Sequence, residues 1–158
     1  MTVKRINNER RTTLPTTVHN ILKDKGTELH FVSPETKLID VLQIMADEDI
    51  GSLLVMDGER LAGIISERDF VRKIVEKGEC PLYRPVSEMM TRKVITVTPS
   101  DKIQQCMILM SEKRIRHLPV VENEKPVGMV SIGDVIKAIL ESKDFTIKQM
   151  ENYISGST

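Results

Sequence analysis

A seven-residue phrase occurs twice in this chain, and each copy places a serine three residues before an aspartate. The copies are residues 63–69 (GIISERD) and 128–134 (GMVSIGD). In both, an apolar run ends at the serine and a helical pattern begins after it, which predicts a strand-to-helix corner. The N-terminus of a helix presents unpaired N–H groups and a partial positive charge, which suit a phosphate. A neighbouring aspartate can accept hydrogen bonds from both hydroxyls of a ribose.

The same spacing also matches a helix-capping pattern. In Ser-x-x-Asp, the serine oxygen accepts a backbone N–H and the acid reaches back to the start of the helix. Such a cap contributes about 1 kcal/mol. Capping and ligand binding are compatible, so one corner taken alone admits both interpretations.

An internal repeat connects the two corners. Shifting the numbering by 65 aligns the two halves without a gap over most of their length. The identical pairs, which fall on expected strand, turn and cap positions, are Val32/Val97, Pro34/Pro99, Lys37/Lys102, Met45/Met110, Ile50/Ile115, Leu53/Leu118, Val55/Val120, Gly63/Gly128, Ser66/Ser131 and Asp69/Asp134. Neither unit would bury its sheet alone, so we expect the two repeats to share one apolar interface.

The predicted elements follow the order β-α-β-β-α. In the first unit we expect strands at 29–32, 52–56 and 60–65, a helix at 37–49, and a helix from Ser66 to a cap at Gly78. In the second unit we expect a helix at 102–113, strands at 117–121 and 127–130, and a helix at 132–140. A short helix at 18–23 precedes the first unit, and residues 145–154 are expected to form a closing helix against the core or a second subunit. The predicted fold class is α/β (α+β), with two repeats related by a pseudo-two-fold axis.

The predicted organisation has five parts. These are a mobile N-terminal arm at 1–15, a first repeat at 16–78, a linker at 79–85, a second repeat at 86–142, and a C-terminal helix or tail at 143–158. The arm carries Lys4, Arg5, Arg10 and Arg11, which could touch phosphates or an acidic partner. Because short charged termini are usually disordered, we interpret it as a solvated tail.

Composition argues against several classes of protein. Lysine plus arginine and aspartate plus glutamate both number 23, a balance unlike the basic excess of nucleic-acid-binding proteins. The three histidines lack metal-ligand spacing, and no nucleophile-and-base pair is visible, so we expect neither a metal site nor an enzyme. Two cysteines without CxxC and no secretory pattern predict a reduced, cytoplasmic protein. No apolar run approaches the roughly 20 residues that span a membrane.

The tandem units also resemble a known family. The run RIRHLPVV at 114–121, with the two Gly-h-h-Ser-x-x-Asp phrases, is similar to a pair of cystathionine-β-synthase-type (CBS) domains, and the resemblance covers residues 18–142. It implies a Bateman module, a regulatory unit that binds adenine nucleotides in clefts between its repeats. AMP is the first candidate ligand, with ADP, ATP or NAD(H) as alternatives. The resemblance further implies a homodimer and an unidentified regulated partner protein.

The resemblance also implies the residues of two clefts. The first would combine the second repeat's corner with the opening segment of the first repeat. It consists of Gly26, Thr27, Glu28, Leu29, Ile50, Gly51, Met129, Ser131 and Asp134, with Arg116 reaching it from its own repeat. The second would reverse these roles and consists of Ile64, Ser66, Arg68, Asp69, Lys93, Val94, Ile95 and Ile115. Side chains at Ile50, Ile115, Ile64 and Met129 would sandwich the purine.

The two clefts are expected to be unequal. Arg68 lies inside the first phrase where the second has Gly133, and Arg116 would supply the charge to the other cleft. We therefore expect anionic ligands at both sites, with different preferences for phosphate number. Two other classes stay open at this stage. One is a structural or partner-binding dimer with vestigial clefts, and the other is a nucleic-acid-associated regulator that uses the basic N-terminal arm.

Overall fold

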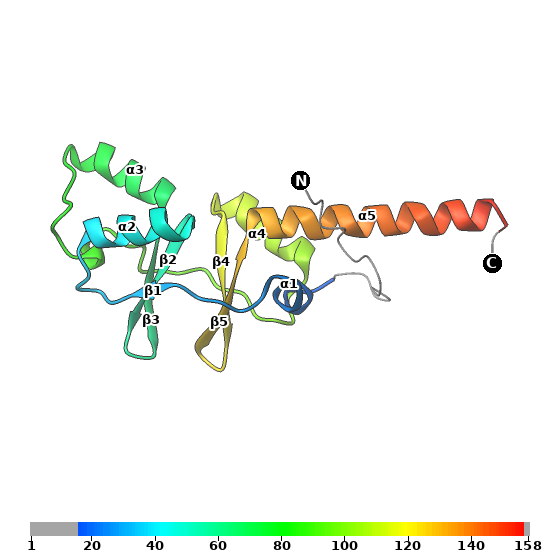
Figure 1. The fold of residues 1–158 in the computed structure, drawn as a ribbon, viewed down its shortest axis with the longest axis horizontal. Coiled ribbons are helices and arrows are strands. Elements are labelled where there is room, and N and C mark those ends of the chain that lie inside the picture. The colour runs from blue at the N-terminus through cyan, green and yellow to red at the C-terminus, as the bar shows by residue number, and fades with distance from the viewer. Residues whose placement is uncertain (1–15, 157–158) are drawn as a thin grey trace, which may run out of the picture.

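The computed structural model describes residues 16–156, so the predicted N-terminal arm lies outside the described residues. Its elements are α1 (Val18–Lys25), β1 (Phe31–Val32), α2 (Leu38–Glu48), β2 (Ser52–Asp57), β3 (Arg60–Ser66), α3 (Glu67–Lys77), the 3-10 helix η1 (Val86–Glu88), α4 (Ile103–Lys113), β4 (His117–Glu122), β5 (Lys125–Ser131) and α5 (Ile132–Ile154) (Figure 1). The β-α-β-β-α order of the first repeat is confirmed. None of the described helices is long and apolar enough to cross a membrane.

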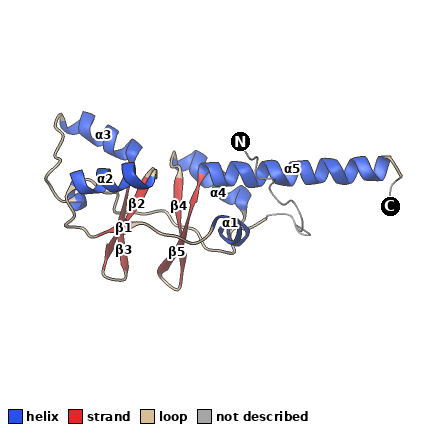
Figure 2. Ribbon diagram, viewed as in Figure 1, coloured by secondary structure: helices blue, strands red, loops and turns tan. Residues whose placement is uncertain are grey.

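Two antiparallel hairpins form the centre of the molecule, and they repeat the same register. The first residue of β2, Ser52, pairs with Ser66, and the equivalent residue of β4, His117, pairs with Ser131. Gly58 and Glu59 form the turn of the first hairpin, since Asp57 still pairs with Arg60, and Gly58 has a φ of 62° that suits a glycine. In Figure 2 both hairpin turns point the same way, away from α2, α3, α4 and α5. The two Ser-x-x-Asp corners are therefore held in equivalent positions.

The second repeat lacks the full opening strand that the repeat predicts. In the first repeat β1 runs parallel to β2, and Leu54 N donates to His30 O at 3.3 Å. The equivalent of Leu54 is Pro119, which has no N–H to donate. The pairing is therefore reduced to one parallel bridge between Val97 and Val120, although its register is unchanged.

The segment that precedes each repeat packs in the core of the other repeat. Helix α1 was expected with the first repeat, but Val18, Ile21 and Leu22 pack in the core of the second, between α5 and β5. Reciprocally, Val86 of η1 and the following Met90 pack in the core of the first repeat. Each repeat is therefore completed by a segment that comes before the other.

The glycine that opens each phrase permits this packing. A Cβ on Gly63 would lie 2.6 Å from Met90 Sδ and 2.9 Å from the Thr91 carbonyl oxygen. A Cβ on Gly128 would lie 2.6 Å from Leu22 Cδ2. The glycines thus let the crossing segment approach the strand closely.

The C-terminal segment differs from its prediction. Residues 132–154 form one continuous helix, α5, because no glycine or proline interrupts residues 134–154. Its second half projects from the rest of the molecule (Figure 1), with Ile147 53% exposed and Tyr153 90% exposed. The expected packing of residues 145–154 against the core is therefore wrong for the single chain.

Candidate functional site

Two clefts lie where the repeats meet, and each includes one serine corner. We call them the Ser66 cleft, with a volume of about 340 Å³, and the Ser131 cleft, of about 420 Å³. Both volumes fall in the range of about 300–1,000 Å³ that is usual for small-molecule sites. Gly51 and His117 line both clefts, so these two residues form the wall between them.

The Ser66 cleft brings together every residue that the sequence assigned to it. These are Ile64, Ser66, Arg68, Asp69, Lys93, Val94, Ile95 and Ile115. The sequence missed Thr91, whose backbone N–H and carbonyl pair with Ile64 at 2.8 and 3.0 Å. It also missed Glu67, Arg72, Lys113 and Arg114, which line the same cleft.

Arg116 lines the Ser66 cleft and not the Ser131 cleft to which it was assigned. Its carbonyl accepts a hydrogen bond from Ile132 N at 2.9 Å, so its backbone supports the Ser131 corner. Arg116, which belongs to the second repeat, therefore lines the cleft that contains the first repeat's serine corner.

The Ser131 cleft contains most of its assigned residues. Seven of them line it, namely Gly26, Glu28, Leu29, Ile50, Gly51, Met129 and Ser131, whereas Thr27 and Asp134 do not. The residues that the sequence missed are Lys25, His30, Asp49, Ser52 and His117. Asp134 instead borders a smaller hollow of about 80 Å³ between α1 and α5.

Both serines cap the helix that follows them. Ser66 Oγ accepts from Asp69 N, and Ser131 Oγ accepts from Asp134 N, each at 3.2 Å. Only the second corner completes the capping box, because Ser131 N also donates to Asp134 Oδ2 at 2.8 Å. The capping interpretation is therefore correct for both serines, and it leaves the Asp69 carboxylate available to the Ser66 cleft.

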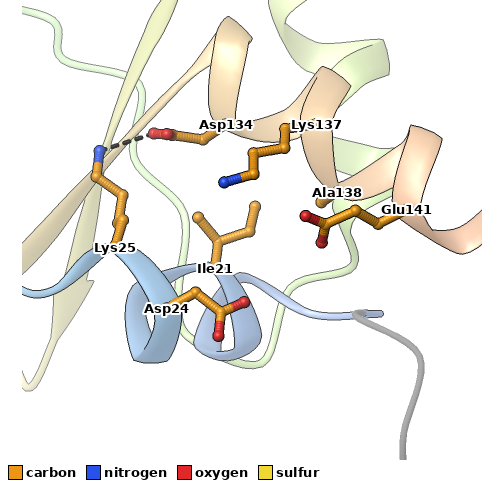
Figure 3. A pocket seen from close by; sticks show the side chains of 7 residues that line it. All are labelled: Ile21, Asp24, Lys25, Asp134, Lys137, Ala138 and Glu141. Atoms are coloured by element: carbon orange, nitrogen blue, oxygen red, sulfur yellow. Dashed lines mark hydrogen bonds and ion pairs between the residues drawn. The ribbon is translucent and has the colours of Figure 1, made fainter. Parts of the chain in front are cut away.

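Asp134 is held by a lysine from α1. Lys25 Nζ lies 2.7 Å from Asp134 Oδ2 (Figure 3). It also donates to the Met129 carbonyl at 2.9 Å. Burial alone would raise the pKa of Asp134, but the hydrogen bonds from Lys25 and Ser131 outweigh it and lower the pKa. No local pattern could reveal this pair, because 109 residues separate its members in the chain.

Comparison with known proteins identifies the repeats. The family model for the CBS domain matches residues 22–76 and 86–141, one match for each repeat. The chain belongs to the CBS-domain family.

Relatives of this CBS pair are similar over most of its length. The mitochondrial CBS domain-containing protein CBSX3 of Arabidopsis thaliana is 35% identical over 150 residues, which are 89% of this chain and 73% of the relative. A CBS-domain-containing protein of Agrobacterium tumefaciens is 32% identical in its crystal structure, with a TM-score of 0.76, covering 83% of this chain and 98% of that one. The crystal structure of CBSX2 in complex with AMP is 25% identical, with a TM-score of 0.66 and coverages of 79% and 97%.

The surroundings of His117, at the wall between the two CBS clefts, lower the pKa of its imidazole. Gly51 packs against it, since a Cβ there would lie 3.3 Å from His117 Cε1. Burial lowers the pKa of His117, the charge of Lys25 lowers it further, and Asp134 and Glu67 oppose the shift. The folded state therefore disfavours the imidazolium form.

This shift predicts a loss of stability in mild acid. Below the ordinary histidine pKa of about 6.5 the unfolded chain binds more protons than the folded chain, so the free energy of unfolding falls as the pH drops. Urea titrations at about pH 7.5 and 5.5 should show that this contribution, at most about 1.4 kcal/mol, disappears in His117→Asn. The exposed His19→Asn is the control and should keep the wild-type difference. An equal pH response in wild type and His117→Asn would contradict the prediction.

Proposed function

We propose that this CBS pair is a non-catalytic regulatory module that binds adenine nucleotides in its two clefts and passes the bound state to a partner protein. The observation that carries the proposal is the pairing of each serine corner with the other repeat's opening segment around a cleft of ligand size. The complex of the related CBSX2 with AMP supports the ligand class. AMP is the first candidate, and ADP, ATP or NAD(H) are the alternatives.

The Ser66 cleft supplies the groups that such a ligand requires. Asp69 would accept hydrogen bonds from the ribose hydroxyls, and the N-terminus of α3 would face a phosphate. Ile64 and Ile115 line the cleft from opposite repeats, so they would hold the purine between them. A ligand that contacts both repeats favours one relative arrangement of them, and it shifts the population only by its difference in affinity for the arrangements.

Thermal unfolding with added nucleotides tests the proposal. A nucleotide at 100 times its Kd should stabilise the chain by about 2.7 kcal/mol. For a chain of 158 residues this corresponds to a rise in Tm of about 5 °C or more. No shift with millimolar AMP, ADP, ATP or NADH would reject nucleotide binding and favour a structural dimer with vestigial clefts.

The same module is proposed to form a homodimer through its helices. Val71 and Val75 on α3 are exposed, as are Ile136 and Leu140 on α5. These apolar side chains would be covered in a dimer, which would in turn provide the surface offered to the regulated protein. Light scattering that returned the mass of a single chain would contradict the dimer.

A further inference from the structure

The internal repeat allows the charges of the two clefts to be compared position by position. Arg114 lines the Ser66 cleft, and the residue 65 positions earlier, Asp49, lines the Ser131 cleft. The two residues have the same backbone, because each is the left-handed C-cap of its helix, with φ of 54° and 52°. Equivalent sites in the fold therefore carry opposite charges.

Other equivalent positions change in the same direction. Lys93 in the Ser66 cleft corresponds to Glu28 in the Ser131 cleft, and Arg116 corresponds to Gly51. Arg68 corresponds to Gly133, which has no charge. At each of these positions the Ser66 cleft is the more positive of the two.

The Ser66 cleft has a large excess of positive charge. Its lining has two carboxylates, Glu67 and Asp69, and six cations, which are Arg68, Arg72, Lys93, Lys113, Arg114 and Arg116. Over residues 16–156 none of these six cations forms an ion pair with a carboxylate. Their charges are therefore not paired within the described residues, and a multiply charged anion could pair with several of them.

The Ser131 cleft has no such excess. Its one lysine, Lys25, is engaged by Asp134, and the lining also includes Glu28 and Asp49. A triphosphate here would face two carboxylates without a free cation from the lining. This cleft therefore favours a ligand with little negative charge.

We propose that the two clefts divide adenine ligands by charge. The Ser66 cleft takes nucleotides that carry a diphosphate or triphosphate, and the Ser131 cleft takes a nucleoside or another adenine ligand of low negative charge. This inference rests on the proposed function and replaces the expectation of anionic ligands at both sites. It makes the module a comparator of two ligands, since each would bias the same contact between the repeats.

A charge exchange at the two C-caps tests the division. Arg114→Asp gives the Ser66 cleft the residue that the Ser131 cleft has at the equivalent position, and Asp49→Arg makes the reverse change. Both residue types already occur at this left-handed C-cap, so the backbone accepts either. Isothermal titration of the full chain with ATP, AMP, adenosine and inorganic tripolyphosphate measures the result. We expect Arg114→Asp to weaken ATP and tripolyphosphate by about 10-fold or more, the scale of one lost charged hydrogen bond. Adenosine affinity should remain at the wild-type value, and Asp49→Arg should raise the ATP stoichiometry from one to two.

The outcomes separate this inference from the proposed function. An ATP stoichiometry of two in wild type, or unchanged ATP affinity in Arg114→Asp, would overturn the charge division while leaving nucleotide binding in place. If tripolyphosphate binds and none of the adenine ligands does, the proposed function is rejected. The Ser66 cleft would then be an anion site that depends on Arg114. Failure of all four probes to bind would reject both.

Discussion

Replacing Gly63 with alanine is expected to lower the free energy of unfolding by about 2 kcal/mol. The added Cβ would lie 2.6 Å from Met90 Sδ and 2.9 Å from the Thr91 carbonyl oxygen. The methionine side chain can move, but the Thr91 oxygen belongs to a backbone pair that joins β3 to the second repeat. Alanine is favoured over glycine in a strand by about 0.5–1 kcal/mol, which offsets only part of this overpacking. Urea denaturation measures the change.

Two other glycines of the repeated phrases provide matched controls. Gly128→Ala should cost less than Gly63→Ala, because its nearest neighbours are the terminal carbons of Leu22 and no backbone atom is among them. Gly133→Ala should raise stability by about 0.5–1 kcal/mol, since it lies in α5 with no atom closer than 3.7 Å to the new Cβ. If all three variants lose similar stability, close approach of the crossing segments is not the reason for the glycines.

Local patterns in the sequence predict most of the secondary structure. Alternating apolar residues and the turn that follows Asp57 define the first hairpin, and the shift of 65 residues transfers its register to the second. The caps at Ser66 and Ser131 follow from Ser-x-x-Asp in the same way. The hairpins and caps depend on residues that are close together in the sequence, so local sequence patterns are sufficient to predict them.

Features that depend on how the repeats cross are not predictable from such patterns. Helix α1 has the same amphipathic pattern whichever core it enters, so the sequence did not show that Leu22 packs on Gly128. The Lys25–Asp134 pair follows from that crossing, and the position of Arg116 in the Ser66 cleft likewise depends on contacts between distant parts of the chain. The missing opening strand was visible in principle, because Pro119 stands where Leu54 donates its N–H.

The crossing also makes the two aspartates of the repeated phrase chemically different. Asp134 accepts hydrogen bonds from Lys25 and from Ser131 N, and it lies outside the lining of the Ser131 cleft. Asp69 lines the Ser66 cleft, and within the described residues its carboxylate forms no hydrogen bond or ion pair. Identical positions in the repeat thus differ: the Asp134 carboxylate is held by contacts within the fold, and the Asp69 carboxylate lines a cleft without such contacts among the described residues.

Alanine at position 134 should therefore mainly lower stability, whereas alanine at position 69 should mainly lower nucleotide affinity. Asp134→Ala is expected to lower the free energy of unfolding by about 2 kcal/mol, because it removes the acceptor of two hydrogen bonds, one from Ser131 N and a charged one from Lys25. The Ser131 cap itself remains, since its oxygen accepts from the backbone N–H of residue 134. Asp69→Ala should cost about 0.5 kcal/mol, the scale of one acid in the first turn of a helix. Nucleotide affinity at the Ser66 cleft should fall about 10-fold or more in Asp69→Ala and stay unchanged in Asp134→Ala.

Acid separates the Asp134 contribution from a general loss of packing. Because the folded state lowers the pKa of Asp134, its stabilisation is present above the ordinary aspartate pKa of about 3.9 and is lost as the pH falls through the folded value. The stability difference between wild type and Asp134→Ala should shrink in that range. Lys25→Met should lose most of the same stability at neutral pH, and the double variant with Asp134→Ala should lose little more than either alone. Additive losses in this double-mutant cycle would show that the two residues act independently, and that the Asp134 carboxylate stabilises the fold through its hydrogen bond with Ser131 N and not through Lys25.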